Sequence, residues 1–150
     1  MTRHEARKKG QAVTRRVVLD PGVLVSAAIS RGPPHRLLIL WVRGRFELVV
    51  SHRLLHELET VLMRARFRRR LSYEEVLEYV LWLRERGILA DEGEEIPSFT
   101  ADPDDDYLIS LANASASDTV VSSDRHLLEA EGEDLPDVSC PAEFLKRVRR

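Results

Sequence analysis

Short apolar runs alternate along the chain with longer segments in which apolar residues recur every three or four positions. The runs at 15–20 (RRVVLD), 46–51 (FELVVS) and 118–124 (DTVVSSD) are rich in valine and leucine, which is typical of strands buried on both faces. Strands that are separated by helices pair in parallel through right-handed crossovers. The pattern therefore predicts an α/β fold: a three-layer α/β/α sandwich with a central, mostly parallel sheet.

Helix start and stop signals divide the intervening segments. Ser51 and Ser72 are predicted N-caps, and Glu75 completes a capping box with Ser72. Gly44 and Gly87 are predicted to end the helices before them. The expected helices cover 23–30, 35–43, 52–64, 73–86, 104–116, 126–133 and 141–150, with short further strands near 88–89 and 137–140. In the second of these helices the face predicted to be buried consists of Leu37, Leu38, Trp41 and Val42.

Length and composition predict one domain and a cellular compartment. A chain of 150 residues with 43% hydrophobic content can bury one sizeable core. We expect a basic, flexible tail over 1–15 and a single domain over 16–150. Cys140 is the only cysteine, which fits a reducing cytosol and argues against a zinc site. No apolar run approaches the ~20 residues of a membrane span, so we expect a cytoplasmic protein without membrane contact.

Charge is unevenly distributed, although the formal net charge is only −2. Basic residues concentrate in 1–16, 64–70 and 146–150, and acidic residues concentrate between 91 and 106. This segregation suits a protein that holds cations in one place and a polyanion around it. A solvated loop between two helices explains the 64–70 segment equally well. The candidate phosphate contacts in that segment are Arg64, Arg66, Arg68, Arg69 and Arg70.

Acidic residues lie near the carboxyl ends of the predicted strands. Asp20 ends the first strand, and Asp124 lies just past the strand in 118–124. Glu57 is in the first turns of the helix after the second strand, and Asp106 heads a later helix. Ligands of open parallel sheets bind outside the carboxyl ends of the strands, where helix N-termini also point. We therefore expect these four carboxylates to converge at one edge of the sheet.

Converging carboxylates without matched bases require a counter-charge, because they repel one another. Mg²⁺ or Mn²⁺ fits this requirement, since both ions take oxygen ligands and the chain offers no thiolate or imidazole cluster. One or two ions could be held, and two would clamp a phosphodiester that a metal-activated water attacks. Asp104 and Asp105 are interpreted instead as capping acids of the following helix.

Four motifs in order resemble those of PIN-domain proteins, specifically the branch that includes toxins of toxin–antitoxin systems, with VapC-type ribonucleases as its best-known members. The motifs are VVLDPGVLVSA, GPPHRLLILWVRGRFELVVSHRLLHELETVL, ADPDDDYLISLA and VVSSDRHLL, and the resemblance runs from Arg16 to Leu145. It implies an endoribonuclease that depends on Mg²⁺ or Mn²⁺, an antitoxin partner and a homodimer, for which the helix at 73–86 offers an apolar face. The family's acids fall on Asp20, Glu57, Asp106 and Asp124, with Ser122 as the accompanying hydroxyl.

One motif departs from the family pattern. The family usually has Asp-Thr-Asn where this chain has Asp20-Pro21-Gly22, which lacks the Asn side chain and one backbone N–H. A second hypothesis is therefore a nuclease-inactive module that binds RNA or a protein partner. A third hypothesis, a phosphotransfer fold, requires a second acid two residues after the first, and that position holds Gly22.

Overall fold

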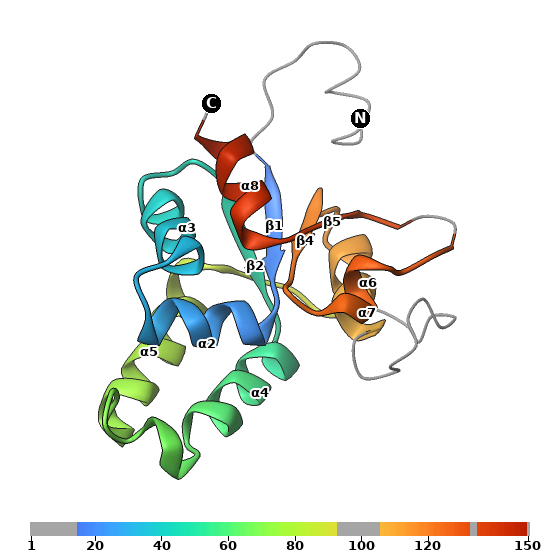
Figure 1. The fold of residues 1–150 in the computed structure, drawn as a ribbon. Helices are drawn as coiled ribbons and strands as arrows, with labels where there is room; N and C mark the ends of the chain where they lie inside the picture. The colour runs from blue at the N-terminus through green and yellow to red at the C-terminus, as the bar shows by residue number, and fades with distance from the viewer. Residues whose placement is uncertain (1–14, 93–105, 133–134, 150) are drawn as a thin grey trace.

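The computed structural model of the chain describes residues 15–92, 106–132 and 135–149, and of Asp106 it describes only the backbone (Figure 1). Almost all of the predicted tail, most of the acidic loop, and Asp104 and Asp105 lie outside these residues. No helix in the described ranges combines the length and the hydropathy needed to cross a membrane. The strands are β1 (Arg16–Leu19), β2 (Glu47–Val50), β3 (Ile88–Leu89), β4 (Thr119–Val121) and β5 (Asp137–Ser139). The helices are α2 (Pro21–Ile29), α3 (Pro33–Val42), α4 (His52–Leu62), the short 3₁₀ helix η1 (Ala65–Phe67), α5 (Tyr73–Arg86), α6 (Asp106–Ala114), α7 (Arg125–Leu128) and α8 (Pro141–Val148).

The five strands form one sheet in the order β3-β2-β1-β4-β5, and every neighbouring pair is parallel. In the centre, Val18 pairs with Val49 on one side and with Val120 on the other. The strand order reverses on either side of β1, which is where ligands bind in open parallel sheets. The structure thus confirms the predicted α/β/α class and brings the carboxyl ends of β1 and β4 together.

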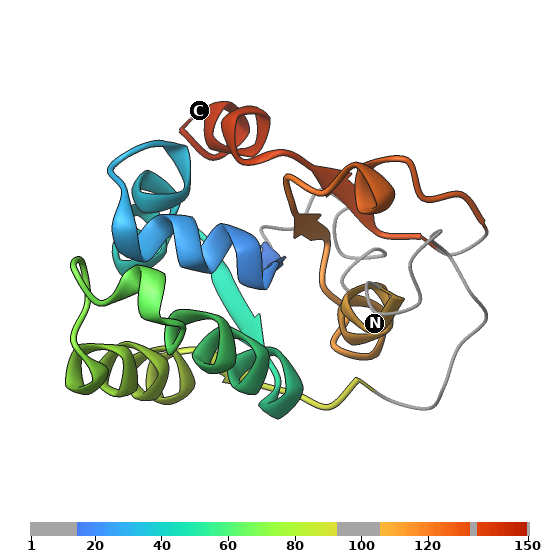
Figure 2. The same ribbon diagram turned by 60° about the horizontal axis from the view of Figure 1, so that its bottom comes forward.

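Helices cover both faces of the sheet. Helices α2, α3 and α8 lie on one side of β1, and α6 lies on the other side, where it contacts β1 and β4 (Figure 2). Helix α4 packs against α2 and α5. The predicted caps of α4 and α5 are confirmed: Ser51 accepts the N–H of Leu54, and Ser72 and Glu75 form a reciprocal capping box. These caps fix where α4 begins, and therefore where Glu57 lies relative to the end of β2.

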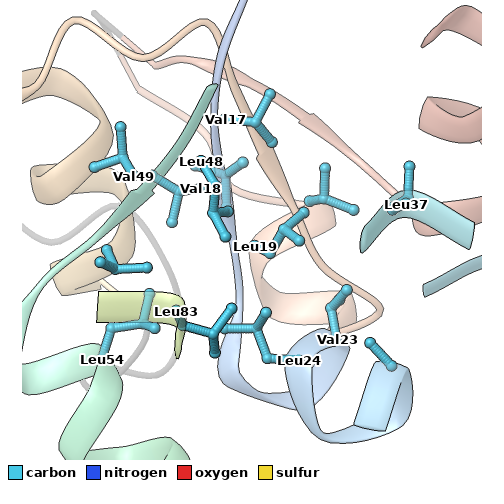
Figure 3. Close-up of a cluster of buried hydrophobic side chains, with 14 of the residues drawn as sticks. Val17, Val18, Leu19, Val23, Leu24, Leu37, Leu48, Val49, Leu54 and Leu83 are labelled. Carbon is cyan, nitrogen blue, oxygen red and sulfur yellow. The ribbon is translucent and has the colours of Figure 1, made fainter. Parts of the chain in front are cut away.

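The hydrophobic core includes residues of α6 and α8 as well as residues of the sheet and of α2, α3, α4 and α5, and Figure 3 shows part of it. Its strand residues Val18, Leu19 and Val49 are fully buried, and so are Leu54 of α4 and Leu83 of α5. Burial of each such side chain stabilises the fold by about 1.5–3 kcal/mol before the entropy cost of ordering is subtracted.

Two expectations about the helices are wrong. Val42 does not belong to the buried face of α3, because it is 49% exposed at the rim of an apolar cavity. The helix expected over 126–133 is only the four-residue α7. Helix α7 ends at Leu128, which is 40% exposed, and of the next three residues, Glu129, Ala130 and Glu131, only Ala130 is apolar, so a longer helix would gain little burial.

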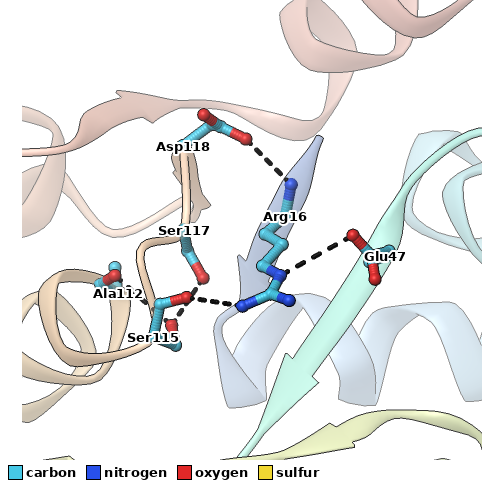
Figure 4. Close-up of polar contacts among 6 residues, drawn as sticks. All are labelled: Arg16, Glu47, Ala112, Ser115, Ser117 and Asp118. Carbon is cyan, nitrogen blue, oxygen red and sulfur yellow. Dashed lines mark hydrogen bonds and ion pairs between the residues drawn. The ribbon is translucent and has the colours of Figure 1, made fainter. Parts of the chain in front are cut away.

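Arg16 links the start of β1 to β2 and to the residues just before β4 (Figure 4). Its backbone N–H donates to Asp118 at 2.9 Å, and its guanidinium donates to the carbonyl of Ser115 at 3.1 Å. The guanidinium Nε also lies 3.6 Å from Glu47 of β2. The side chain is half-buried, so water screens these contacts less than it screens those of a surface pair.

We predict that Arg16→Met lowers the free energy of unfolding by roughly 1–2 kcal/mol, because the contacts of the guanidinium are lost while the hydrophobic stem is kept. The matched control is Arg125→Met. Arg125 makes a comparable ion pair with Glu129 at 3.7 Å, but the two side chains are 81% and 67% exposed, and such pairs contribute little. Urea denaturation of both variants measures the difference. Equal stabilities would show that the Arg16 contacts are not stabilising.

Candidate active site

A cavity of about 300 Å³ opens at the carboxyl ends of β1 and β4. Three of the four predicted acids line it, and they come from three distant segments of the chain: Asp20 after β1, Glu57 on α4, and Asp124 after β4. Asp106 is the first residue of α6, whose next two residues, Tyr107 and Leu108, also line the cavity. The other lining residues are Pro21, Gly22, Val23, Ser26 and Ser123.

Asp20 is the most buried of these acids, with 8% of its surface exposed. Its Oδ1 accepts the N–H of Gly22 at 2.6 Å and that of Val23 at 3.2 Å, so that it caps α2. Its Oδ2 accepts the hydroxyl of Ser122. Burial raises the pKa of Asp20, the hydrogen bonds oppose this rise, and the charge of Asp124 adds to it. The ionised carboxylate is therefore costly, and a bound cation would relieve that cost.

The Asp20-Pro21-Gly22 turn explains how the departure from the family motif is accommodated. Pro21 has no N–H to donate and occupies the first position of α2, where none is needed. The backbone of Gly22 instead makes a short hydrogen bond to Asp20. A Cβ at position 22 would lie 3.0 Å from Oδ1 of Asp20, so glycine permits the carboxylate to approach this closely.

Ser122 connects two of the acidic segments. Its fully buried side chain donates to Asp20, while its Oγ accepts the backbone N–H of Asp124 at 2.9 Å. Asp124 in turn caps the short helix α7 by accepting the N–H of His126 at 2.8 Å. One hydroxyl therefore fixes both the orientation of the Asp20 carboxylate and the position of the backbone that carries Asp124.

Tyr107 orients Glu57, the third acid that lines the cavity. Its hydroxyl donates to Oε2 of Glu57, and its ring is buried under the guanidinium of Arg53, which lies 4.1 Å from the ring centroid. Burial raises the pKa of Tyr107, and the hydrogen bond to Glu57 raises it further. The tyrosine therefore remains a neutral donor toward Glu57. No motif or periodicity in the sequence indicates this contact, because it joins side chains of two different helices.

Among the described side chains, no three Asp, Glu, His or Cys residues come close enough to surround one ion. Asp20, Glu57 and Asp124 nevertheless line one cavity. Mg²⁺ keeps several waters and usually binds proteins through one or two carboxylates, so it does not require three of them in direct contact. The donor set, consisting of carboxylates with a serine hydroxyl behind them, therefore suits a hard, hydrated divalent cation.

The arginines of the 64–70 segment differ in their exposure and in their contacts with the rest of the chain. Arg68 is half-buried, donates to the carbonyl of Leu62 and stacks on Tyr73 with its guanidinium carbon 4.1 Å from the ring centroid. Arg70 donates to the carbonyl of Ile29 at 2.5 Å. The side chains of Arg64, Arg66 and Arg69 are exposed, and Arg66 lies over the ring of Phe67.

A larger cavity, of about 400 Å³, lies between α2, α3 and α5, but its lining is mostly apolar. Of its polar residues, Tyr79 donates its hydroxyl to the carbonyl of Leu24 at 2.8 Å. Trp82 lies beside it and packs edge-on against Trp41, with ring centroids 5.0 Å apart. None of the described residues that line this cavity carries a carboxylate, so the smaller cavity is the candidate active site.

The order of the parallel strands and the acids at their carboxyl ends define a PIN-type α/β/α domain. The chain belongs to the PIN-domain family, whose family model, described as "PIN domain", matches residues 16–126. No curated protein matches the chain. Among solved structures, PAE2754 from Pyrobaculum aerophilum superposes with a TM-score of 0.59 at 16% identity, over 90% of each chain. VapBC2 from Rickettsia felis, bound to a DNA fragment from its promoter, superposes with a TM-score of 0.56 at 15% identity, over 83% of this chain and 98% of that one. At these identities the two structures show a shared fold.

Proposed function

We propose that this protein is an endoribonuclease that depends on Mg²⁺ or Mn²⁺ and hydrolyses RNA phosphodiesters by metal-activated water. The observation that carries the proposal is the meeting of Asp20, Glu57 and Asp124 around one cavity at the reversal of strand order. Membership of the PIN-domain family supports it. Among the described residues the buried Asp20 has no ion-pair partner, so no basic side chain there offsets its charge.

In this proposal Asp20, Glu57, Asp106 and Asp124 hold one or two ions, directly or through water. A bound ion would lower the pKa of a coordinated water and offset the charge that develops on the phosphate oxygens. Ser122 orients the carboxylate of Asp20, and Tyr107 orients that of Glu57. Fixing the carboxylates in advance reduces the reorganisation that the reaction requires.

The proposed partners are RNA, an antitoxin and a second copy of the chain. RNA phosphates would contact the 64–70 arginines, all of which except the half-buried Arg68 are exposed. The antitoxin proposal is supported by the family and by the fold shared with VapBC2. For the homodimer we propose the outer face of α5, where Tyr73, Leu77 and Leu81 are each at least 50% exposed. Light scattering would measure the homodimer directly.

The alternative is a nuclease-inactive module that binds RNA or a protein partner. It is motivated by the altered first motif, Asp20-Pro21-Gly22. Both oxygens of Asp20 accept hydrogen bonds from the chain itself, which leaves each with fewer lone pairs for an ion. RNA binding that survives EDTA, without any cleavage in Mn²⁺, would favour this alternative.

The proposal is tested by incubating purified protein with a defined RNA in Mn²⁺, Mg²⁺ or EDTA. We expect cleavage that requires the metal and is lost in Asp106→Asn, a variant that keeps the size of the side chain and removes its charge. A contaminating nuclease would remain active in the Asp106→Asn preparation. Absence of metal-dependent cleavage by the natural protein would refute the proposal.

A further inference from the structure

Arg53 lies at the edge of the carboxylate-lined cavity without a carboxylate partner of its own. Its guanidinium is 4.1 Å from the centroid of the Tyr107 ring, and its side chain is exposed. Within the described part of the chain Arg53 forms no ion pair, although Glu57 lies one helical turn further along α4. The carboxylate of Glu57 accepts the hydroxyl of Tyr107 instead.

The stacking on Tyr107 determines which part of Arg53 remains available. A guanidinium that stacks on an aromatic ring uses its flat face, whereas its five N–H donors point outward in the plane. These donors match the paired oxygens of a phosphate. Because the Tyr107 ring is buried in the fold, the stack also limits the rotation of Arg53 before any ligand arrives.

The negative charge of the cavity favours a cation such as the Arg53 guanidinium at its rim. Asp20, Glu57 and Asp124 all line the cavity, and none of the lining residues that the structure describes is basic. An approaching phosphodiester meets this negative field, and a positive group at the rim offsets part of it and orients the strand.

We propose that Arg53, stacked on Tyr107, forms a phosphate-binding subsite that takes an RNA phosphodiester next to the one being hydrolysed. This inference rests on the proposed function, because it assumes that RNA enters the carboxylate-lined cavity. Tyr107 acts in it as a positioning residue for both Arg53 and Glu57. The subsite supplies affinity and register for the strand without reading its sequence.

The experiment measures binding of a single-stranded RNA oligonucleotide in EDTA, where cleavage does not interfere. We expect Arg53→Ala to weaken binding roughly tenfold. The slope of log affinity against log salt should also fall in magnitude by about 0.7, the value for one lost contact to a single strand. The matched control is Arg45→Ala, which removes an exposed arginine just before β2, at the opposite edge of the sheet, and should bind as the natural protein does.

A second variant separates the two roles of Tyr107. Tyr107→Phe keeps the ring under Arg53 and removes the hydrogen bond to Glu57. We expect unchanged RNA binding in EDTA, but weaker Mn²⁺ binding by calorimetry and slower cleavage, by about 10- to 100-fold.

The subsite is overturned if Arg53→Ala retains the affinity and salt slope of the natural protein, or if Arg45→Ala loses as much. RNA binding that depends on Arg53 in a protein that cleaves no RNA would refute the nuclease and leave the subsite standing. Metal-dependent cleavage by Arg53→Ala, with unchanged KM and kcat, would refute the subsite and leave the nuclease standing.

Discussion

Asp20→Asn is expected to lower metal-dependent RNA cleavage about a thousandfold, because a metal contributes several kcal/mol to the transition state and each 1.36 kcal/mol is a factor of ten. Asparagine can still accept the N–H groups of Gly22 and Val23, so the cap of α2 is preserved. Its amide carries no charge for an ion. The loss should therefore appear in Mn²⁺ binding, measured by calorimetry, as well as in cleavage.

The same substitution should make the metal-free protein more stable at neutral pH. Burial raises the pKa of Asp20 in the folded state, so the folded protein holds this proton more tightly than the unfolded chain does. The resulting stabilisation is complete below the ordinary pKa of 3.8 and is lost as the pH rises through the raised value. Asp20→Asn avoids that loss. Its Tm in EDTA should match that of the natural protein in acid and exceed it at pH 7.

The control for Asp20→Asn is Asp137→Asn. Asp137 begins β5 at the opposite edge of the sheet and pairs with Arg147 at 2.6 Å, far from the cavity lining. It should keep full cleavage activity and gain no stability at neutral pH. If Asp20→Asn cleaves RNA as fast as the natural protein, Asp20 is not a metal ligand and serves only as the cap of α2.

The fold could be predicted because its signals are local or periodic. Valine-rich runs of strand length, the Ser72–Glu75 capping box and Gly87 at the end of α5 all appear in the structure. Parallel pairing follows from the alternation of strands and helices. Gly87 also has a tertiary role that its helix-ending signal does not reveal, because a Cβ there would lie 3.3 Å from the carbonyl oxygen of Leu48 in β2.

The candidate site was predictable only in part. Carboxylates at strand ends indicate a shared edge, and three of them do line one cavity. Tyr107 and Arg53 escape the sequence patterns because they meet across α4 and α6, 54 positions apart in sequence, through a ring contact. The sequence does place Arg53 and Glu57 four positions apart, on one face of a helix. This spacing alone cannot distinguish an ion pair between the two side chains from two separate roles.

Glu57→Gln is expected to slow metal-dependent cleavage by about a hundredfold, since even the hydrogen-bonding partners of metal ligands are worth about 10- to 100-fold. Glutamine keeps the length of the side chain and an oxygen that can accept the Tyr107 hydroxyl, so the arrangement of α4 and α6 is retained. Only the charge that faces the cavity is removed. Mn²⁺ affinity should fall together with kcat.

Glu59→Gln provides the matched control for this prediction, because it removes the same charge from the same helix two residues further on. Glu59 does not line the cavity, and a helix places positions two apart on different faces. Its substitution should leave cleavage and Mn²⁺ affinity unchanged. A loss in Glu57→Gln alone would indicate that Glu57 holds the ion, whereas a general effect of the charge on α4 would lower both quantities in both variants. Equal losses in both variants would mean that the net charge of α4, and not a ligand at position 57, controls the activity.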